Sequence, residues 1–220
     1  MQANTLISSS IKSIHPVEDG NRAMEMMDQF RVHHLAIVKN NFYLGVVSDK
    51  EIMNWESEDD LIEEHLNNLA APHVKYNQHL FDIIEVLEKN NLSVVPVLDE
   101  KNQYLGVITN RKLMYSIAKS ATIQSPGGVI VLEMSNNDYS LTEIASIVES
   151  NNTKILSSYI ISKPKSTNIE VTIKLNKQDV TAIIKDFERR QYNISASYKD
   201  EEADGDFSER YESLMRFLNP

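Results

Sequence analysis

The sequence contains no cysteine, which excludes disulfide bonds, thiolate metal sites and cysteine nucleophiles. It also has no run close to the roughly 20 consecutive apolar residues that a membrane-spanning helix requires. The first five residues, Met-Gln-Ala-Asn-Thr, lack the basic and then apolar pattern of a signal peptide. Together these absences predict a cytoplasmic protein with no membrane partner.

Positive charge is scarce relative to negative charge. The chain has 22 Lys and Arg against 32 Asp and Glu, a formal net charge of −10. Because Lys and Arg supply most of the affinity for a phosphate backbone, this balance argues against nucleic-acid binding, although a local basic patch could still bind a small phosphate. The 220 residues, of which 41% are apolar, suffice for one or two folded domains.

Motifs of catalysis are absent as well. The chain has no Gly-x-Ser-x-Gly elbow, Walker loop, dinucleotide fingerprint or His-Glu-x-x-His motif. The adjacent His33 and His34 would point to opposite faces and make a poor chelating pair. The run Glu63-Glu64-His65 is more typical of a charged helical face than of a metal site. We therefore predict no catalytic residues, no metal site and no enzymatic activity.

What the sequence does contain is an internal duplication. Residues 43–53 return as residues 104–114 with the same pattern at nearly every position. The offset is 60 upstream and becomes 61 in this segment, because the turn at residues 39–42 is one residue shorter than the turn at residues 99–103. Such a difference is best tolerated between two strands of a hairpin. The repeat is therefore the structural unit.

Each copy is predicted to contain a strand, a helix, two strands joined by a turn, and a second helix that begins near Asp49 or Asn110. Apolar residues at helical spacing mark the first helix of each copy: Ala23, Met26, Met27 and Phe30 in one, Leu80, Ile83, Ile84 and Leu87 in the other. A unit of about sixty residues is too small for a generous core, so the two copies are expected to pack together. The acidic segment 55–60 would link them.

A second domain is predicted after the breaker cluster Ser-Pro-Gly-Gly at residues 125–128. The expected elements are a strand, a helix, two strands, a helix and a strand, at residues 129–134, 141–148, 155–162, 169–175, 177–190 and 192–198. This order is the ferredoxin-like split arrangement. The predicted domains are thus 1–60, 61–122 and 128–199, followed by an acidic linker and amphipathic helix at 200–220, which would cover its own chain or a dimer mate, or bind a partner.

The first 120 residues resemble a tandem pair of cystathionine-beta-synthase (CBS) domains, the Bateman module. The resemblance rests on two Gly-hydrophobic-hydrophobic-Ser/Thr stretches, at 45–48 and 106–109, and on the strand Val-Pro-Val-Leu at 95–98. Residues 128–198 look like an ACT domain, and the combination is similar to small bacterial regulators of the acetoin-utilisation type. The resemblance implies an α+β fold, with CBS repeats packed as a pseudo-two-fold pair, then a ferredoxin-like ACT domain and a C-terminal helix.

The resemblance also implies that AMP, ADP, ATP or a related adenosyl compound binds between the repeats. A Ser or Thr where a strand meets a helix lies beside unpaired N–H groups, a natural phosphate site, and the family places an acid three residues later to bind the ribose. Here Ser48 is followed by Glu51, and Thr109 by Arg111 and Lys112. The candidate nucleotide-binding residues are Ser48, Glu51, Val74, Val95, Pro96, Thr109, Arg111 and Lys112.

Each candidate has an alternative role. Ser48 and Glu51 also form a Ser-x-x-Glu capping box, which stabilises a helix start without any ligand. Lys112 cannot accept ribose hydroxyl protons, but with Thr109 and Arg111 it could attract a polyphosphate and favour ADP or ATP. Otherwise these two cations are exposed helix charges.

The loop at residues 137–141 lacks the Pro-Gly that ACT domains commonly carry there. Asn137, Asp138 and Ser140 are its ligand candidates, although Asp138 or Ser140 more simply caps the next helix. Two hypotheses follow. One is a homodimeric regulator in which an adenine nucleotide, with no required cofactor, alters the ACT-like domain or a protein partner. The other is a structural dimeric scaffold whose nucleotide sites have decayed.

Overall fold

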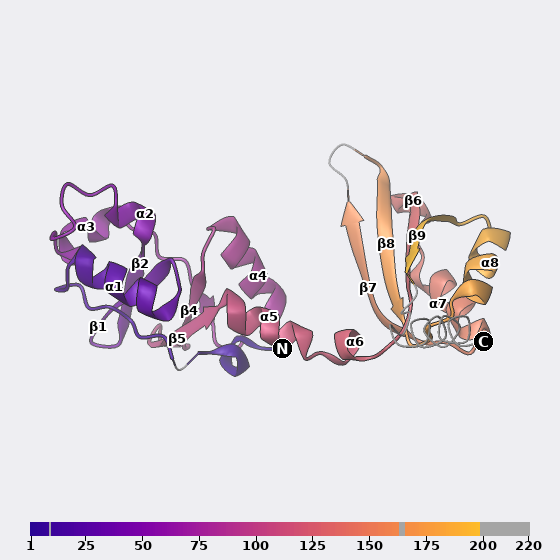
Figure 1. Cartoon of the computed structure of the whole chain (residues 1–220), viewed down its shortest axis with the longest axis horizontal. Helices are drawn as coiled ribbons and strands as arrows, with labels where there is room; N and C mark the ends of the chain where they lie inside the picture. The colour runs from indigo at the N-terminus through magenta and orange to yellow at the C-terminus, as the bar shows by residue number, and fades with distance from the viewer. Residues whose placement is uncertain (9, 163–165, 199–220) are drawn as a thin grey trace, which may run out of the picture. The chain divides into compact units, whose positions relative to one another are not determined.

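The computed structural model describes residues 1–8, 10–162 and 166–198, so the predicted linker and helix at 200–220 lie outside the described residues. The chain divides into two units, Met1–Ala118 and Lys119–Pro220 (Figure 1). Among the described residues, no helix has both the length and the apolar character needed to cross a bilayer.

The first unit contains the two repeats. The first repeat comprises α1 (Gly20–Phe30), β1 (His34–Lys39), β2 (Phe42–Ser48) and α2 (Asp49–Ile52). The second comprises β3 (Val74–Lys75), α4 (Leu80–Lys89), β4 (Val94–Leu98), β5 (Tyr104–Thr109) and α5 (Asn110–Ala118). The short α3 (Ile62–His65) and a 3-10 turn at Leu66–Asn68 lie between them, and another 3-10 turn, Ala3–Leu6, precedes α1.

The first helix of each repeat forms where the apolar spacing predicts it. In α1, the Asp19 side chain accepts from the Arg22 N–H at 2.7 Å and caps the helix start. The helix ends at Arg31, which has a left-handed φ of 55°. The equivalent residue after α4, Asn91, has a φ of 49°. Both helices therefore turn back toward their strands in the same way.

The one-residue difference between the repeats lies in the hairpin turns. The first hairpin closes through Asn40 and Asn41, with φ of 52° and 66°, as a two-residue turn of this type requires. In the longer second turn, Asp99 Oδ1 accepts from the N–H groups of Lys101 and Gln103, each at 2.8 Å. Each hairpin also has a bulge at the same place, after Ile37 and after Val97.

Two elements of the first repeat are short. The strand expected around Ile14 is a single parallel bridge to Ile37, whereas its counterpart β3 pairs with β4 over two residues. The helix that begins at Asp49 ends after one turn. The Asn54 side-chain amide donates to the Lys50 carbonyl at 2.7 Å and replaces the next helical bond.

The repeats share their cores. The cluster around α1 includes Val94 and Val107 of the second repeat, and the cluster around α4 includes Val46 of the first. The N-terminal segment also packs with the second repeat, since the N–H of Ala3 donates to the Gln78 carbonyl at 3.0 Å and the buried side chain of Ala3 joins that cluster. Neither repeat completes its core alone.

The second unit has a four-stranded antiparallel sheet in the order β7-β8-β6-β9. Its elements are α6 (Ala121–Gln124), β6 (Val129–Ser135), a 3-10 turn (Asn136–Asp138), α7 (Leu141–Ser150), β7 (Ile155–Ser162), β8 (Asn168–Leu175), α8 (Thr181–Arg189) and β9 (Asn193–Tyr198). Figure 1 shows α7 and α8 on one side of the sheet, where they form the core with β6 and β8. This is the predicted ferredoxin-like order.

One boundary in this unit differs from the prediction. The second helix was expected from residue 177 but begins at Thr181. The Gly128 N–H donates to the Lys177 carbonyl at 2.8 Å and holds that residue against the start of β6. Asp179 Oδ1 then accepts from the Thr181 N–H at 3.0 Å. The chain can therefore enter the helix only after this contact.

Candidate functional site

Two clefts of the first unit are related by the repeat offset. The first cleft, of about 610 Å³, lies between residues 48–51 at the β2–α2 junction and residues 90–93 before β4. The second cleft, of about 920 Å³, lies between residues 109–112 at the β5–α5 junction and residues 30–33 before β1. Each cleft therefore combines the strand–helix junction of one repeat with the helix–strand junction of the other.

The first cleft contains the predicted Ser48 and Glu51, and the pair forms the capping box. Glu51 Oε2 accepts from the Ser48 N–H and the Ser48 hydroxyl, both at 2.7 Å, while the Glu51 N–H donates to Ser48 Oγ at 3.1 Å. The cap holds the carboxylate at the cleft wall. Among the described residues both bonds end on Oε2, so Oε1 is the oxygen that could accept from a ligand hydroxyl.

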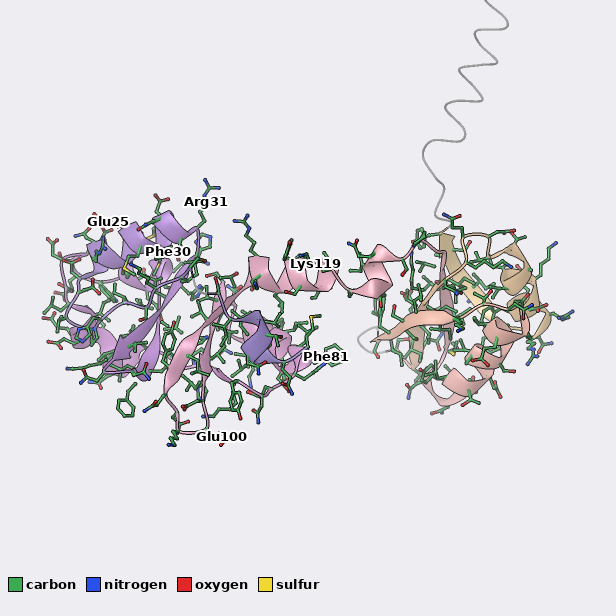
Figure 2. All side chains as sticks on the ribbon, turned by 90° about the horizontal axis from the view of Figure 1, so that it is seen from below. Glu25, Phe30, Arg31, Phe81, Glu100 and Lys119 are labelled. Atoms are coloured by element: carbon green, nitrogen blue, oxygen red, sulfur yellow. The ribbon has the colours of Figure 1, made fainter. Side chains whose placement is uncertain are left out.

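The second cleft has the opposite charge, because the first cleft is lined by Asp49 and Glu51 against the single cation Lys50. Thr109, Arg111 and Lys112 all line it, as does Arg31 from the other repeat. Figure 2 shows the Arg31 side chain extending outward from the end of α1. Thr109 Oγ1 accepts from the Lys112 N–H at 3.0 Å, so this junction is capped as well. Of the described residues that line the second cleft, none is Asp or Glu. The cleft is therefore suited to an anion.

Three residues line both clefts: His33, Ser93 and Asn110. The His33 N–H donates to Ser93 Oγ at 2.9 Å, and His33 Nδ1 lies 2.7 Å from Asp49 Oδ2. The pseudo-two-fold relation is visible in the backbone, since Asp49 N–H donates to the His33 carbonyl and Asn110 N–H to the Ser93 carbonyl, each at 3.2 Å. This wall connects the two clefts through direct hydrogen bonds.

His34 lies behind the same wall and lines only the first cleft. The Ser93 N–H donates to His34 Nδ1 at 3.2 Å, which requires a lone pair on that nitrogen. Burial lowers the pKa of His34, and this effect outweighs the opposing attraction of Asp49 and Glu51. The imidazole is therefore held in its neutral form at neutral pH.

Three predicted nucleotide-binding residues line neither cleft. Val74, Val95 and Pro96 are buried within β3 and β4, and the two valines belong to the core cluster around α4. The family strand motif thus contributes to packing at these positions. A role for these three residues in nucleotide binding therefore stays a prediction.

In the part of the second unit that the structure describes, the loop candidates lie away from the cavity described below. Asn137 and Asp138 lie in the 3-10 turn, and Ser140 Oγ accepts from the Glu143 N–H at 3.3 Å as the cap of α7. A cavity of about 560 Å³ lies elsewhere, and none of the three lines it. Its lining comprises Ala145, Glu149, Asn152, Thr153, Lys154, Ile155 and Asn176.

Several cleft residues were not anticipated from the sequence: Arg31, His33 and residues 90–93. They lie opposite the motif-bearing junctions and come from the other repeat. One signal was available, since the offset of 60 aligns Arg31 with Asn91. Pairing each strand–helix junction with the other repeat's helix end would have found both.

A curated relative of this chain is a homoserine O-acetyltransferase from Methanocorpusculum labreanum, 27% identical over 119 residues, which are 53% of this chain and 24% of that protein. This chain thus spans about a quarter of the relative's length. Among solved structures, a CBS domain pair/ACT domain protein from Thermotoga maritima has a TM-score of 0.48 at 12% identity, covering 55% of this chain and 99% of that one. CBSX2 in complex with AMP has a TM-score of 0.44 at 16% identity, covering 54% and 96%.

A family comparison covers the two repeats. Residues 3–58 and residues 68–119 each match the model described as the CBS domain. The two matched segments contain the two strand–helix junctions that carry Ser48 and Thr109, one in each. The first unit of this chain is thus a tandem pair of CBS domains.

Proposed function

We propose that this protein is a regulatory sensor that binds an adenine nucleotide in the clefts between its CBS repeats. CBS domain pairs typically bind adenosine ligands in regulatory roles. The observation that carries the proposal is the opposite charge of two clefts that share one backbone design. Glu51 lines one, while Arg31, Arg111 and Lys112 line the other.

The two clefts have groups suited to different parts of a nucleotide: the first to the ribose, and the second to the phosphates. In the first cleft, Glu51 accepts from ribose hydroxyls while its other oxygen maintains the cap. In the second, Thr109 and the N–H groups that begin α5 meet a phosphate, and the three cations bind the remaining charge of a polyphosphate. This arrangement favours ADP or ATP in the second cleft over adenosine.

Thermal melting with AMP, ADP, ATP and S-adenosylmethionine, each at millimolar concentration, tests the sensor function. A ligand present at 100 times its dissociation constant stabilises the folded protein by about 2.7 kcal/mol, and a clear rise in melting temperature is expected with ATP. Unchanged melting with all four compounds would refute the proposal.

Two variants separate the clefts. Lys112→Ala should lower the affinity for ATP by about tenfold and the affinity for AMP by less, because only the polyphosphate needs the additional cation. Glu51→Gln retains the capping geometry, since Gln also serves in a capping box, and should weaken every ligand that is bound through its ribose. Equal weakening of ATP and AMP by Lys112→Ala, measured by calorimetry, contradicts the polyphosphate role.

The proposal extends to the output of the sensor. The ferredoxin-like second unit would act as an ACT-like domain that receives the change in repeat packing, in a homodimeric bacterial protein of the cytoplasm. Transmission to a separate protein partner is the alternative route. We assign no amino-acid ligand to Asn137, Asp138 and Ser140, because Ser140 already caps α7. A ligand transmits a change only if it binds one arrangement better than the other.

A second candidate function is a dimeric scaffold with decayed sites. It is favoured by the capping bonds that occupy Ser48 and by Lys112 at a position where the family carries an acid. A scaffold would be a dimer in sedimentation experiments and would show the same melting temperature with and without nucleotide. A sensor would instead show a higher melting temperature in the presence of its nucleotide.

A further inference from the structure

Asp60, Glu64 and His65 come together at the link between the two repeats. One ligand atom from each side chain lies within 4.8 Å of the others. Asp60 Oδ2 is 3.2 Å from His65 Nε2. The sequence places Glu64 and His65 on a charged helical face, and the fold adds Asp60 to them. We propose that these three residues bind a divalent transition-metal cation of the Zn²⁺ type.

The backbone that carries these side chains is held in place by its neighbours. The Gly20 N–H donates to the Asp60 carbonyl at 3.2 Å, and the Ile62 N–H donates to the Glu18 carbonyl at 3.0 Å. The Glu63 N–H donates to the Pro16 carbonyl at 2.9 Å. The loop and α3 are thus anchored to the segment before α1. Donor atoms on an anchored backbone lose little freedom when they bind a cation.

The imidazole of His65 is oriented by an aromatic contact. Its ring stacks on Trp55 with centroids 4.0 Å apart and an angle of 3° between the planes. The His65 side chain is 21% exposed and the Asp60 side chain 26% exposed, so solvent reaches both. The stack holds Nε2 in the direction of Asp60. Groups that surround a metal site commonly orient the ligand atoms in this way.

One imidazole nitrogen and two carboxylate oxygens form a donor set suited to Zn²⁺ and similar ions. Bonds of about 2.0–2.2 Å place the donor atoms of one metal roughly 3–3.5 Å apart. The Asp60–His65 separation of 3.2 Å already fits. The Glu64 carboxylate lies within 4.8 Å of the other two donor atoms, and its side chain is exposed, so a small rotation about its side-chain bonds is enough to close the remaining distance to an ion. A fourth position stays open to water.

The test uses Trp55, which is the only tryptophan of the chain. The full chain, treated with a chelator and dialysed, is titrated with Co²⁺ while tryptophan fluorescence is recorded. Since His65 stacks directly on Trp55, Co²⁺ at the site should quench the fluorescence in a saturable way with one ion per chain. Zn²⁺, which does not quench by itself, should compete and restore the signal.

Neighbouring glutamates supply a matched control. Glu64→Gln and Asp60→Asn should each weaken the apparent Co²⁺ affinity at least about tenfold. Glu63→Gln makes the same substitution at the adjacent residue of the same helix, and it should leave the apparent Co²⁺ affinity unchanged. His65 is retained in every variant, so the stack on Trp55 is preserved. Unsaturable quenching, or equal affinity in Glu64→Gln and Glu63→Gln, overturns the proposal.

Discussion

In the first repeat, the hydroxyl that ends β2 is followed three residues later by Glu51, and in the second repeat, the hydroxyl that ends β5 is followed by Lys112. In both, the hydroxyl oxygen accepts from the N–H of that third residue, at 3.1 Å and 3.0 Å. The backbone requirement at a helix start is thus identical in the two repeats. The side chain beyond that N–H is free to differ, so duplication retained the fold while the charge of the clefts diverged.

The two cores differ in the size of an equivalent buried side chain. Ala23 in α1 occupies the position of Ile83 in α4, and both are fully buried. Met26 and Met27, flexible side chains that fill irregular space, lie beside Ala23. The first repeat therefore accommodates a small residue where the second has a large one. Exchanging such pairs shows how far the two repeats are interchangeable.

The largest effect is expected when the core positions are exchanged. Ile83→Ala should lower the free energy of unfolding by about 2–5 kcal/mol through lost burial and a cavity. Ala23→Ile should cost about 1–3 kcal/mol by overpacking. Denaturant unfolding measures both, with the half-exposed Ile84→Ala on the same helix as control. If Ile83→Ala costs no more than Ile84→Ala, the core assignment is wrong.

The two hairpins carry equivalent glycines, Gly45 and Gly106, in different backbone conformations. Gly106 has a φ of +142°, and a Cβ built there would lie 2.6 Å from Ile7 Cγ2. A Cβ on Gly45 would meet the Ala70 carbonyl at 3.1 Å without an unusual φ. Gly106→Ala should therefore cost about 1–3 kcal/mol and more than Gly45→Ala.

The double variant Gly106→Ala with Ile7→Ala separates the two causes at this glycine. It removes the contact with Ile7 and retains the backbone strain. Its unfolding free energy should show partial recovery after the separate cost of Ile7→Ala is subtracted. Complete recovery would mean that φ contributes nothing.

The two helix caps should differ by a smaller amount. Ser48→Ala and Thr109→Ala should each cost about 1 kcal/mol. The cost at Ser48 should be the larger, because its hydroxyl also donates to Glu51 at 2.7 Å. Thermal unfolding without nucleotide measures this difference. A larger loss at Thr109 would show that the capping box adds nothing to the first repeat.

The smallest effect concerns pH, at a position where the repeats differ in chemistry. His34 aligns with Val94 through the offset of 60. Because burial lowers the pKa of His34 in the folded protein, the unfolded chain binds its proton first as the pH falls below about 6.5. The contribution of neutral His34 to the free energy of unfolding is therefore fully present above that pH, and it is lost as the pH falls toward the folded-state pKa of His34.

His34→Val should flatten this part of the stability profile between pH 8 and pH 5. The exposed His79→Gln serves as the control. The measurement is the melting temperature at each pH, compared with that of the unsubstituted protein. An unchanged slope in His34→Val would assign the acid dependence to other groups.

Much of the fold was predictable because it depends on local signals. Apolar spacing marked α1 and α4, and the changed offset marked the turn where the repeats differ by one residue. The error at the start of α8 arose where a nonlocal contact overrides local preference, since the Gly128–Lys177 hydrogen bond delays the helix. The end of α2 is instead a local effect, because the Asn54 side chain bonds to the Lys50 carbonyl four residues before it.

The duplication, the order of elements and the exchange of Glu51 for Lys112 could all be read from the amino-acid sequence, because each depends only on the pattern of residue types along the chain. Which helix end faces each strand–helix junction depends on how the two repeats pack together. The packing of the unit brings Arg31 into the same cleft as Thr109 and Lys112, and Asp60 beside His65. Periodicity reports which face an element buries, but the partner across that face depends on the packing of the whole unit.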